Sequence, residues 1–198
     1  DCSFCTYFED QKYQYKDIDK VIGELKEITS ETGINQVWFA DQNLFNDPDY
    51  LKKLALKIQE EDLDIEWAGL GMIVGREQEF FDILAESGLK AVYHGIESAS
   101  NTVLHRMQKH QTRDMIESTL EKESNAGIKP FGGFITDYVN ETWEEYFETL
   151  DFIKKNPHLM GGEATALRVF PDERQPLYRN PEKFGIEIEE SKQQDLMN

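Results

Sequence analysis

The chain has 198 residues, of which 21 are Lys or Arg and 39 are Asp or Glu, so its formal net charge at pH 7 is −18. Such a surplus of negative charge disfavours nucleic acids and anionic membranes as partners, because binding them depends on Lys and Arg that neutralise phosphate. No apolar run approaches the ~20 residues of a membrane span, no secretory leader is recognisable, and two cysteines are too few for a disulfide framework, so we expect one cytoplasmic globular domain.

Amphipathic segments alternate with short apolar ones along the chain. In chain order, the residue pattern predicts a helix over 18–28, a strand over 35–40, a helix over 51–58, strands over 65–70, 90–96 and 129–135, a helix over 143–153 and a strand over 164–170. Strands that alternate with helices at intervals of roughly 30 residues are typical of βα units in a parallel sheet.

Residues at the predicted boundaries support these elements. Asp47 before Pro48 places a capping side chain ahead of a proline at the first helical position. Thr142 and Glu145 fit a capping box, in which each side chain bonds a backbone amide near the other residue. Three glycines each precede a strand and allow the left-handed conformation that ends a helix, namely Gly33, Gly88 and Gly127.

The absence of glycine-rich phosphate motifs favours a barrel over other parallel folds. Neither G-x-G-x-x-G nor a P-loop sequence occurs, which disfavours Rossmann and P-loop enzymes. Because the first periodic segment is a helix, we expect the first strand of the array to lie upstream of Asp1. Cys2 and Cys5 would then lie in the loop after that strand, where barrel enzymes carry their chemistry.

Cys2 and Cys5 are the only cysteines, and their C-x-x-C spacing by itself leaves several interpretations open. The pair could be half of a zinc site, a redox pair, or a coincidence of sequence. A zinc site needs two further ligands, but the four histidines are scattered through the chain, without an H-x3-H pair.

Four blocks in the sequence, together with the cysteine pair, resemble the radical S-adenosylmethionine (SAM) enzymes, over about residues 2 to 178. Cys2-Ser3-Phe4-Cys5 is similar to the end of the C-x3-C-x-aromatic-C motif of that superfamily, whose first cysteine would lie upstream of Asp1. The four blocks are VWFADQNLFND (37–47), HGIESASNTVLHRMQKH (94–110), GGFITDYVNETWEEYFETLDFI (132–153) and VFPDERQPLY (169–178). The block at 94–110 resembles the cobalamin-binding and methylthiolation branches most closely.

The resemblance implies an α/β fold, a partial (βα)6 TIM-like barrel with parallel strands, whose first strand is missing from this chain. The barrel would span residues 1–178, and residues 179–198 would form a C-terminal extension that leads to a further segment. The implied cofactors are a 4Fe-4S cluster, SAM, and cobalamin bound by an absent upstream domain. The implied partners are a small-molecule or peptide substrate and an electron donor such as flavodoxin or ferredoxin.

The resemblance also implies an activity and roles for individual residues. The enzyme would generate a 5′-deoxyadenosyl radical, or support methyl transfer, on an unknown substrate. Cys2 and Cys5 would be cluster ligands, and six residues would contact SAM, namely Phe4, Asp41, Glu97, Lys109, Gly133 and Arg168. Within this set Glu97 would accept bonds from the ribose hydroxyls, Asp41 would bind the methionine ammonium and Lys109 would meet the methionine carboxylate.

Two departures from the family pattern keep a second class of function in view. Asp137, Val139 and Asn140 stand where the fifth-strand motif usually has glycine, proline and glycine. The segment 172–175 replaces the usual Gly-Thr after the sixth strand. These differences motivate an alternative hypothesis, a non-catalytic scaffold or binding domain with the same barrel.

Overall fold

The computed structural model describes residues 2–6, 13–157, 164–167, 169 and 172–187. Its elements are α1 (Ile18–Thr32), β1 (Gln36–Phe39), the 3-10 turn η1 (Leu44–Asn46), α2 (Pro48–Glu60), β2 (Glu66–Gly71), α3 (Gln78–Glu86), β3 (Leu89–Glu97), α4 (Asn101–Arg106), α5 (Arg113–Asn125), β4 (Lys129–Ile135), α6 (Trp143–Lys155), β5 (Ala164–Leu167), α7 (Pro176–Arg179) and the 3-10 turn η3 (Pro181–Phe184). None of the helices among these residues is both long and apolar enough to cross a bilayer.

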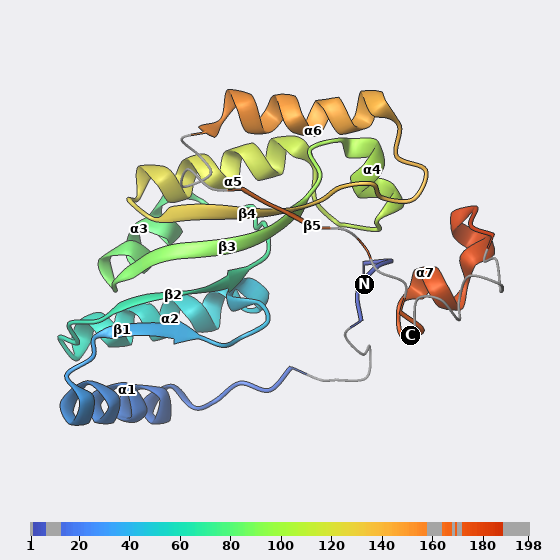
Figure 1. The fold of residues 1–198 in the computed structure, drawn as a ribbon. Coiled ribbons are helices and arrows are strands. Elements are labelled where there is room, and N and C mark those ends of the chain that lie inside the picture. Colours follow the sequence, from blue (N-terminus) through green and yellow to red (C-terminus); the bar gives the residue numbers. More distant parts are fainter. Residues whose placement is uncertain (1, 7–12, 158–163, 168, 170–171, 188–198) are drawn as a thin grey trace.

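The five described strands form one sheet in sequential order, β1-β2-β3-β4-β5, and every neighbouring pair is parallel. Figure 1 shows the strands stacked from β1 to β5, with α1 beyond β1 and α6 beyond β4. A doubly wound sheet would instead reverse its strand order at a switch point. The predicted parallel α/β fold, of the partial-barrel kind, is therefore confirmed.

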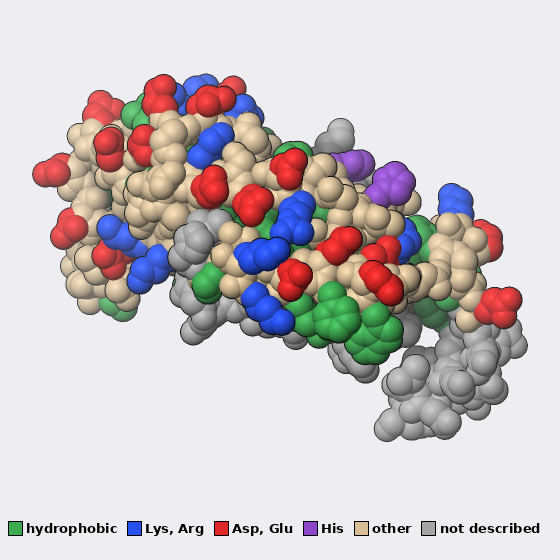
Figure 2. Space-filling view, turned by 90° about the horizontal axis from the view of Figure 1, so that it is seen from above, with side chains coloured by type: hydrophobic (Ala, Val, Ile, Leu, Met, Phe, Trp, Pro, Cys, Tyr) green, Lys and Arg blue, Asp and Glu red, His purple; other side chains and the backbone are tan. Residues whose placement is uncertain are grey.

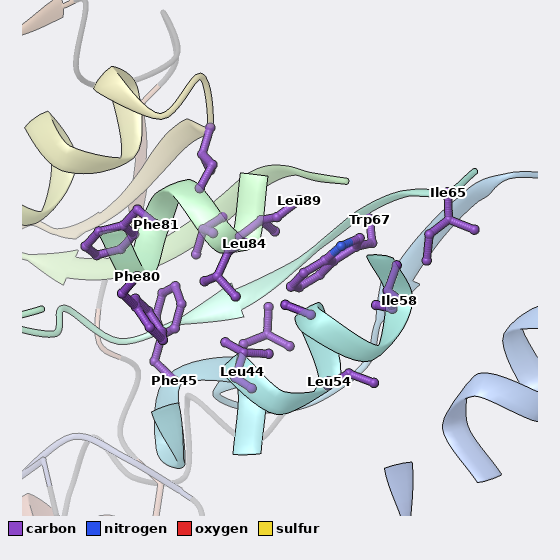
Figure 3. Packing of buried hydrophobic residues seen from close by; sticks show 14 of the residues in the cluster. Leu44, Phe45, Leu54, Ile58, Ile65, Trp67, Phe80, Phe81, Leu84 and Leu89 are labelled. Atoms are coloured by element: carbon purple, nitrogen blue, oxygen red, sulfur yellow. The ribbon is translucent and has the colours of Figure 1, made fainter. Parts of the chain in front are cut away.

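One face of the sheet is covered by the helices. Around Trp67 and Val92, the larger core cluster collects buried residues of α1, α2 and α3, including Leu25, Leu54 and Phe81. Figure 3 shows Trp67 pointing from β2 into this cluster, beside Leu84 and Ile58. Burial of such side chains removes apolar surface from water and is the main source of stability here.

A second cluster continues the same packing toward β4. Ile96 of β3 and Phe134 of β4 contact residues of α4, α5 and α6, namely Leu104, Ile116, Leu120 and Phe152. Since Val92 and Ile96 are an even number of residues apart on β3, both clusters lie on the same side of the sheet. The opposite side is thus left uncovered by these helices.

The predicted boundary residues take the expected conformations. Asp47 accepts bonds from the amides of Asp49 and Tyr50, and the capping box of Thr142 and Glu145 is complete. Gly88 has a φ of 99°, and a Cβ there would collide with the Ile65 carbonyl. This turn between α3 and β3 therefore requires glycine.

One packing prediction made from helical spacing is wrong. The helical spacing of Phe147, Leu150 and Ile153 predicts that Phe147 and Leu150 point inward, yet the Phe147 side chain is 52% exposed and Leu150 is only half-buried. The buried face of α6 is set instead by Thr149 and Phe152. Phe147 lies two residues before Thr149, which is about 200° around the helix, so both cannot face the sheet. Figure 2, which looks down on α6, shows acidic side chains spread over this surface and a patch of hydrophobic ones.

The centre of the sheet holds a fully buried polar pair. His94 of β3 lies with Nε2 2.9 Å and 3.0 Å from the two carboxylate oxygens of Glu123 on α5, and its Nδ1 is 2.9 Å from the Gly71 carbonyl oxygen. Both side chains are 0% exposed. A single histidine at the end of an apolar run is most often a hydrogen-bonded structural residue, and His94 has the burial and the partners of one.

We predict that Glu123→Ala lowers the free energy of unfolding by about 3–5 kcal/mol, because it leaves His94 buried without its partner. Urea denaturation followed by circular dichroism measures the change. Glu121→Ala, on the exposed side of the same helix, is the matched control and should stay within about 0.5 kcal/mol of the unmodified chain. Equal stability of the two variants would contradict the assignment.

Candidate functional site

The parallel strands bring the predicted site residues to one edge of the sheet. Asp41 follows β1 by two residues, Glu97 ends β3, and both strands run in the same direction. Because the carboxyl ends of parallel strands share an edge, these two acids lie at the same end of the sheet. This is the end at which barrel enzymes build their active sites.

The two cysteines belong to one tight turn. The Cys5 amide donates to the Cys2 carbonyl oxygen at 3.1 Å, and both residues are half-buried. Phe4, inside the turn, packs against a third buried cluster that includes Ile135 and Leu177. The spacing of the two cysteines therefore places both sulfur atoms on the same local structure.

Ser3 anchors this turn to the rest of the protein and is completely buried. Its amide donates to the Met107 carbonyl oxygen at 2.9 Å, and its carbonyl accepts from the Leu177 amide at 2.9 Å. The Ser3 hydroxyl lies 2.6 Å from the Tyr138 hydroxyl. In Figure 1 the N-terminal segment accordingly lies beside α7 and near the end of α4. Three distant segments thus fix the position of the cysteine turn.

Glu97 and Lys109 form an ion pair at the carboxyl end of β3. Lys109 Nζ donates to Glu97 Oε1 at 2.9 Å and to the Gly95 carbonyl oxygen at 2.7 Å. The side chains of Lys109 and Glu97 are only 7% and 14% exposed. A Cβ at Gly95 would meet the ends of both side chains, so the pair in this position occupies space that glycine leaves open.

A local irregularity aims the Glu97 side chain. Glu97 has a φ of 67°, in the left-handed region, and the pairing of β3 with β4 shifts register between Gly95 and Glu97. Such bulges redirect a side chain and are over-represented next to active sites. A left-handed glutamate is strained, and strain of this kind clusters at functional sites.

The cysteine turn lies near this ion pair, because the Ser3 amide bonds the carbonyl of Met107, two residues before Lys109. Burial raises the pKa of Cys2, and the positive charge of Lys109 opposes that rise. The charges of Cys5 and Glu97 raise the pKa of Cys2 further. These interactions connect the cysteine turn and the Glu97–Lys109 pair as parts of one site.

Other residues that we expect to contact SAM lie beside neighbours other than the Glu97–Lys109 pair. Asp41, Tyr13 and Tyr50 line one pocket. Burial raises the pKa of both phenols, and the negative charge of Asp41 raises it further. The space next to Gly133 is filled by the Tyr93 hydroxyl, 2.8 Å from where a Cβ would be. Arg168 lies outside the described residues. The SAM-binding roles of these residues remain predictions.

Several residues of the site were not identified from the sequence. Tyr138 and Ser3 meet across 135 positions, and no local pattern marks such a contact. Gln111 donates to the Ile96 carbonyl oxygen at 2.8 Å, next to Glu97. Nor does any sequence pattern pair Glu97 with Lys109, which we expected to bind separate parts of SAM.

The loop after β4 has left-handed backbone conformations at two of its unusual residues. Asp137 and Asn140 have φ values of 61° and 57°, the left-handed region that glycine adopts freely. Asp and Asn tolerate this region better than other non-glycine residues. The replacement of two expected glycines is therefore compatible with the backbone path that glycines would take.

The cysteine turn supplies donors suited to a metal cluster, but only two of them. Within the described part of the chain, no group of three or more His, Cys, Asp or Glu side chains is arranged to hold a metal ion. Thiolate sulfur is a soft ligand that suits iron–sulfur clusters. Cys2 and Cys5 therefore fit two positions of a cluster and do not form a complete site by themselves.

Comparison with known proteins gives consistent results. A family model described as the radical SAM superfamily matches residues 1–153. An uncharacterized methyltransferase of Pyrococcus horikoshii is 28% identical over 156 residues, which cover 78% of this chain and 34% of the relative. The cytidylyl-2-hydroxyethylphosphonate methyltransferase of Streptomyces wedmorensis is 28% identical over 210 positions, which cover 93% of this chain and 39% of the relative. The chain thus spans little more than a third of the length of these relatives.

Solved structures share the fold at low sequence identity. The radical SAM methyltransferase TsrM of Kitasatospora setae, solved with cobalamin and a [4Fe-4S] cluster, has a TM-score of 0.80 at 16% identity, over 89% of this chain and 34% of TsrM. The cobalamin-dependent SAM radical enzyme OxsB, with aqua-cobalamin bound, has a TM-score of 0.72 at 18% identity, over 92% of this chain and 28% of OxsB. Both likenesses concern the fold.

We predict that Tyr138→Phe loosens the cysteine turn, because it removes the hydroxyl that contacts Ser3. The free energy of unfolding should fall by about 1 kcal/mol, and Cys2 and Cys5 of the cluster-free protein should be alkylated several-fold faster by iodoacetamide. Tyr146→Phe is the control, because the Tyr146 hydroxyl makes no hydrogen bond within the part of the chain that the structure describes. Equal alkylation rates in the two variants would show that the position of Ser3 and its turn does not depend on the Tyr138 hydroxyl.

Proposed function

The chain belongs to the radical SAM superfamily, and on this basis we propose that it is the SAM-binding core of a radical SAM methyltransferase. The observation that carries the proposal is the hydrogen bond that holds the cysteine turn to Met107, two residues before Lys109 of the buried Glu97–Lys109 pair at the carboxyl edge of the sheet. Soft sulfur ligands and a held carboxylate at one place suit a cluster and a polar cosubstrate.

Cys2 and Cys5 would hold the cluster together with a ligand from outside these residues. When bound, a cluster of this kind supplies a single electron to the sulfonium of SAM. The contribution of the chain is positional, because a reaction with a short-lived radical depends on a fixed geometry and on the exclusion of water. The buried Ser3 bonds hold the turn in place for this purpose.

Glu97 would bind the ribose hydroxyls of SAM. An ionised carboxylate accepts hydrogen bonds from two neighbouring hydroxyls. Lys109 keeps this carboxylate in place and supplies positive charge toward the methionine carboxylate of SAM. Held already by Lys109, which also donates to the Gly95 carbonyl, the Glu97 side chain loses little conformational freedom when SAM binds.

Methyl transfer is the reaction that the relatives support. Two relatives carry methyltransferase in their names, and TsrM is a methyltransferase whose structure holds cobalamin and a cluster. We infer a small-molecule methyl acceptor, a cobalamin held by protein outside these 198 residues, and an electron donor such as flavodoxin or ferredoxin. The left-handed Asp137 and Asn140 weaken the scaffold alternative, because the loop that motivated it keeps a glycine-like path.

We predict that Glu97→Gln in the intact, anaerobically reconstituted protein weakens SAM binding and leaves the iron content unchanged. Loss of a charge-assisted hydrogen bond should cost about 1.5–3 kcal/mol, roughly a tenfold or greater rise in Kd. Isothermal titration calorimetry measures SAM affinity, and a colorimetric iron assay measures the cluster.

Glu121→Gln is the matched control, since Glu121 is an exposed glutamate on α5, and it should bind SAM as the unmodified protein does. Equal affinities in the two variants would remove Glu97 from the SAM site. Failure of the unmodified, iron-loaded protein to bind SAM at all would overturn the proposed function.

A further inference from the structure

The outward side of α6 carries three aromatic rings in mutual contact. Trp143 and Phe147 are 73% and 52% exposed, and Tyr146 is half-buried. The centroids of the three rings lie between 5.9 and 6.2 Å apart in every pair. We call these three residues the aromatic patch. Single exposed apolar side chains are ordinary on a protein surface, whereas contiguous ones mark an interaction site.

The aromatic patch belongs to a second apolar side of α6, distinct from the side that packs on the sheet. At 100° per residue, Trp143, Phe147 and Leu150 lie within about 60° of one another around the helix axis. Phe152, which is buried in the second core cluster, lies about 180° from Trp143. One apolar side of α6 therefore serves the core, and the described residues leave the other exposed.

A stripe of acids follows one flank of the aromatic patch. Glu144, Glu148 and Asp151 are exposed and lie within about 60° of one another on the helix. None of the three forms an ion pair within the part of the chain that the structure describes, whereas Glu145 of the same helix is paired with Arg106. Figure 2 shows the hydrophobic patch on this surface with acidic side chains beside it. A ligand of the aromatic patch would therefore meet negative charge along its flank.

The charges of the chain disfavour a second copy as that ligand. Two copies would bring together net charges of −18 each, and like charges repel. In an antiparallel pairing of two α6 helices the stripe of acids would meet its own copy. Only Lys154 and Lys155, at the last turn of α6, would relieve this repulsion.

The size of the surface favours a transient partner. The 13 residues of α6 rise about 20 Å along the helix axis. One face of such a helix offers less than the ~800 Å² that each partner of a stable complex buries. Opposite charge would speed the encounter with a basic partner and make it sensitive to salt.

We propose that the outward side of α6 is a docking site for a basic amphipathic helix of another protein. The apolar side chains of that helix would lie on the aromatic patch and on Leu150, whose spacing gives anchors at i, i+3, i+4 and i+7. Its Lys and Arg side chains would reach the stripe of acids. Arginine suits this surface because its guanidinium also stacks on aromatic rings. The docking site lies on the outer side of the helix layer and adds an interaction that SAM binding does not require.

A fluorescein-labelled synthetic peptide tests the docking site by fluorescence anisotropy on the intact protein. The peptide consists of leucine and arginine, with the leucines along one side, and has about 20 residues so that a helix can form. We expect saturable binding that weakens as salt is added. A peptide of the same composition in scrambled order has no apolar side, and it should bind at least about tenfold more weakly. A leucine and glutamate peptide should not bind.

Two alanine variants assign the binding to the aromatic patch. Trp143→Ala and Phe147→Ala should each weaken binding of the ordered peptide about tenfold. Both positions are exposed, and alanine has the highest helix propensity, so α6 should stay folded, as circular dichroism checks. Leu56→Ala is the matched control, at a 45% exposed leucine of α2, and should leave the affinity unchanged.

A charge reversal assigns the flank. Glu148→Lys should weaken binding at least about threefold and reduce its salt dependence. Glu27→Lys, at an exposed glutamate of α1, changes the net charge by the same amount and should stay within about twofold of the unmodified protein.

Three results would overturn the assignment. The first is equal affinity for the ordered and the scrambled peptide, and the second is unchanged affinity in both alanine variants. The third is a dimer in sedimentation velocity that Phe147→Ala dissociates, since it would assign the surface to a second copy. SAM affinity in Phe147→Ala should equal that of the unmodified protein, so the docking site and the SAM site fail or stand independently.

Discussion

The contact between the Lys109 ammonium and the end of β3 is the interaction on which the site depends. Lys109 binds both the Gly95 carbonyl and the Glu97 carboxylate, and so connects the segment after α4 to the central strand. Two residues before Lys109, the Met107 carbonyl receives the Ser3 amide. The position of the cysteine turn is therefore tied through a short segment to the position of Glu97.

The central strand carries an ionisable side chain on each of its faces. His94 points toward the helices and meets Glu123, whereas Glu97 follows the bulge and meets Lys109 on the other side. Charges removed from water are costly unless paired, so each partner is held firmly by the other. This pairing allows a strand in the middle of the core to end in a carboxylate that stays at a fixed place.

The two sides of the sheet differ in character. The helix-covered side holds the two main core clusters, and function on such a scaffold is determined by the site and not by the fold. The side of the sheet away from the helices carries apolar rings such as Trp38 and Tyr93. In the loop, Asp137 and Asn140 keep left-handed backbones while adding polar side chains at the edge of the site.

Features that depend on neighbouring residues could be predicted from the amino-acid sequence. Periodicity predicted the parallel strands, and Thr142 and Glu145 predicted the capping box. Such features follow from local geometry, because a helix or a turn is set by residues a few positions apart.

The tertiary structure determined which distant residues come into contact. The contacts of Ser3 with Tyr138 and of His94 with Glu123 join residues 135 and 29 positions apart. The same holds for the helix phase that exposes Phe147, because the buried face of α6 was selected by the surface it packs against. The pairing of Glu97 with Lys109 also required the left-handed turn at the end of β3. Local sequence patterns do not distinguish between possible long-range partners, whereas packing in the folded chain does. The contacts within the site were therefore determined by the fold.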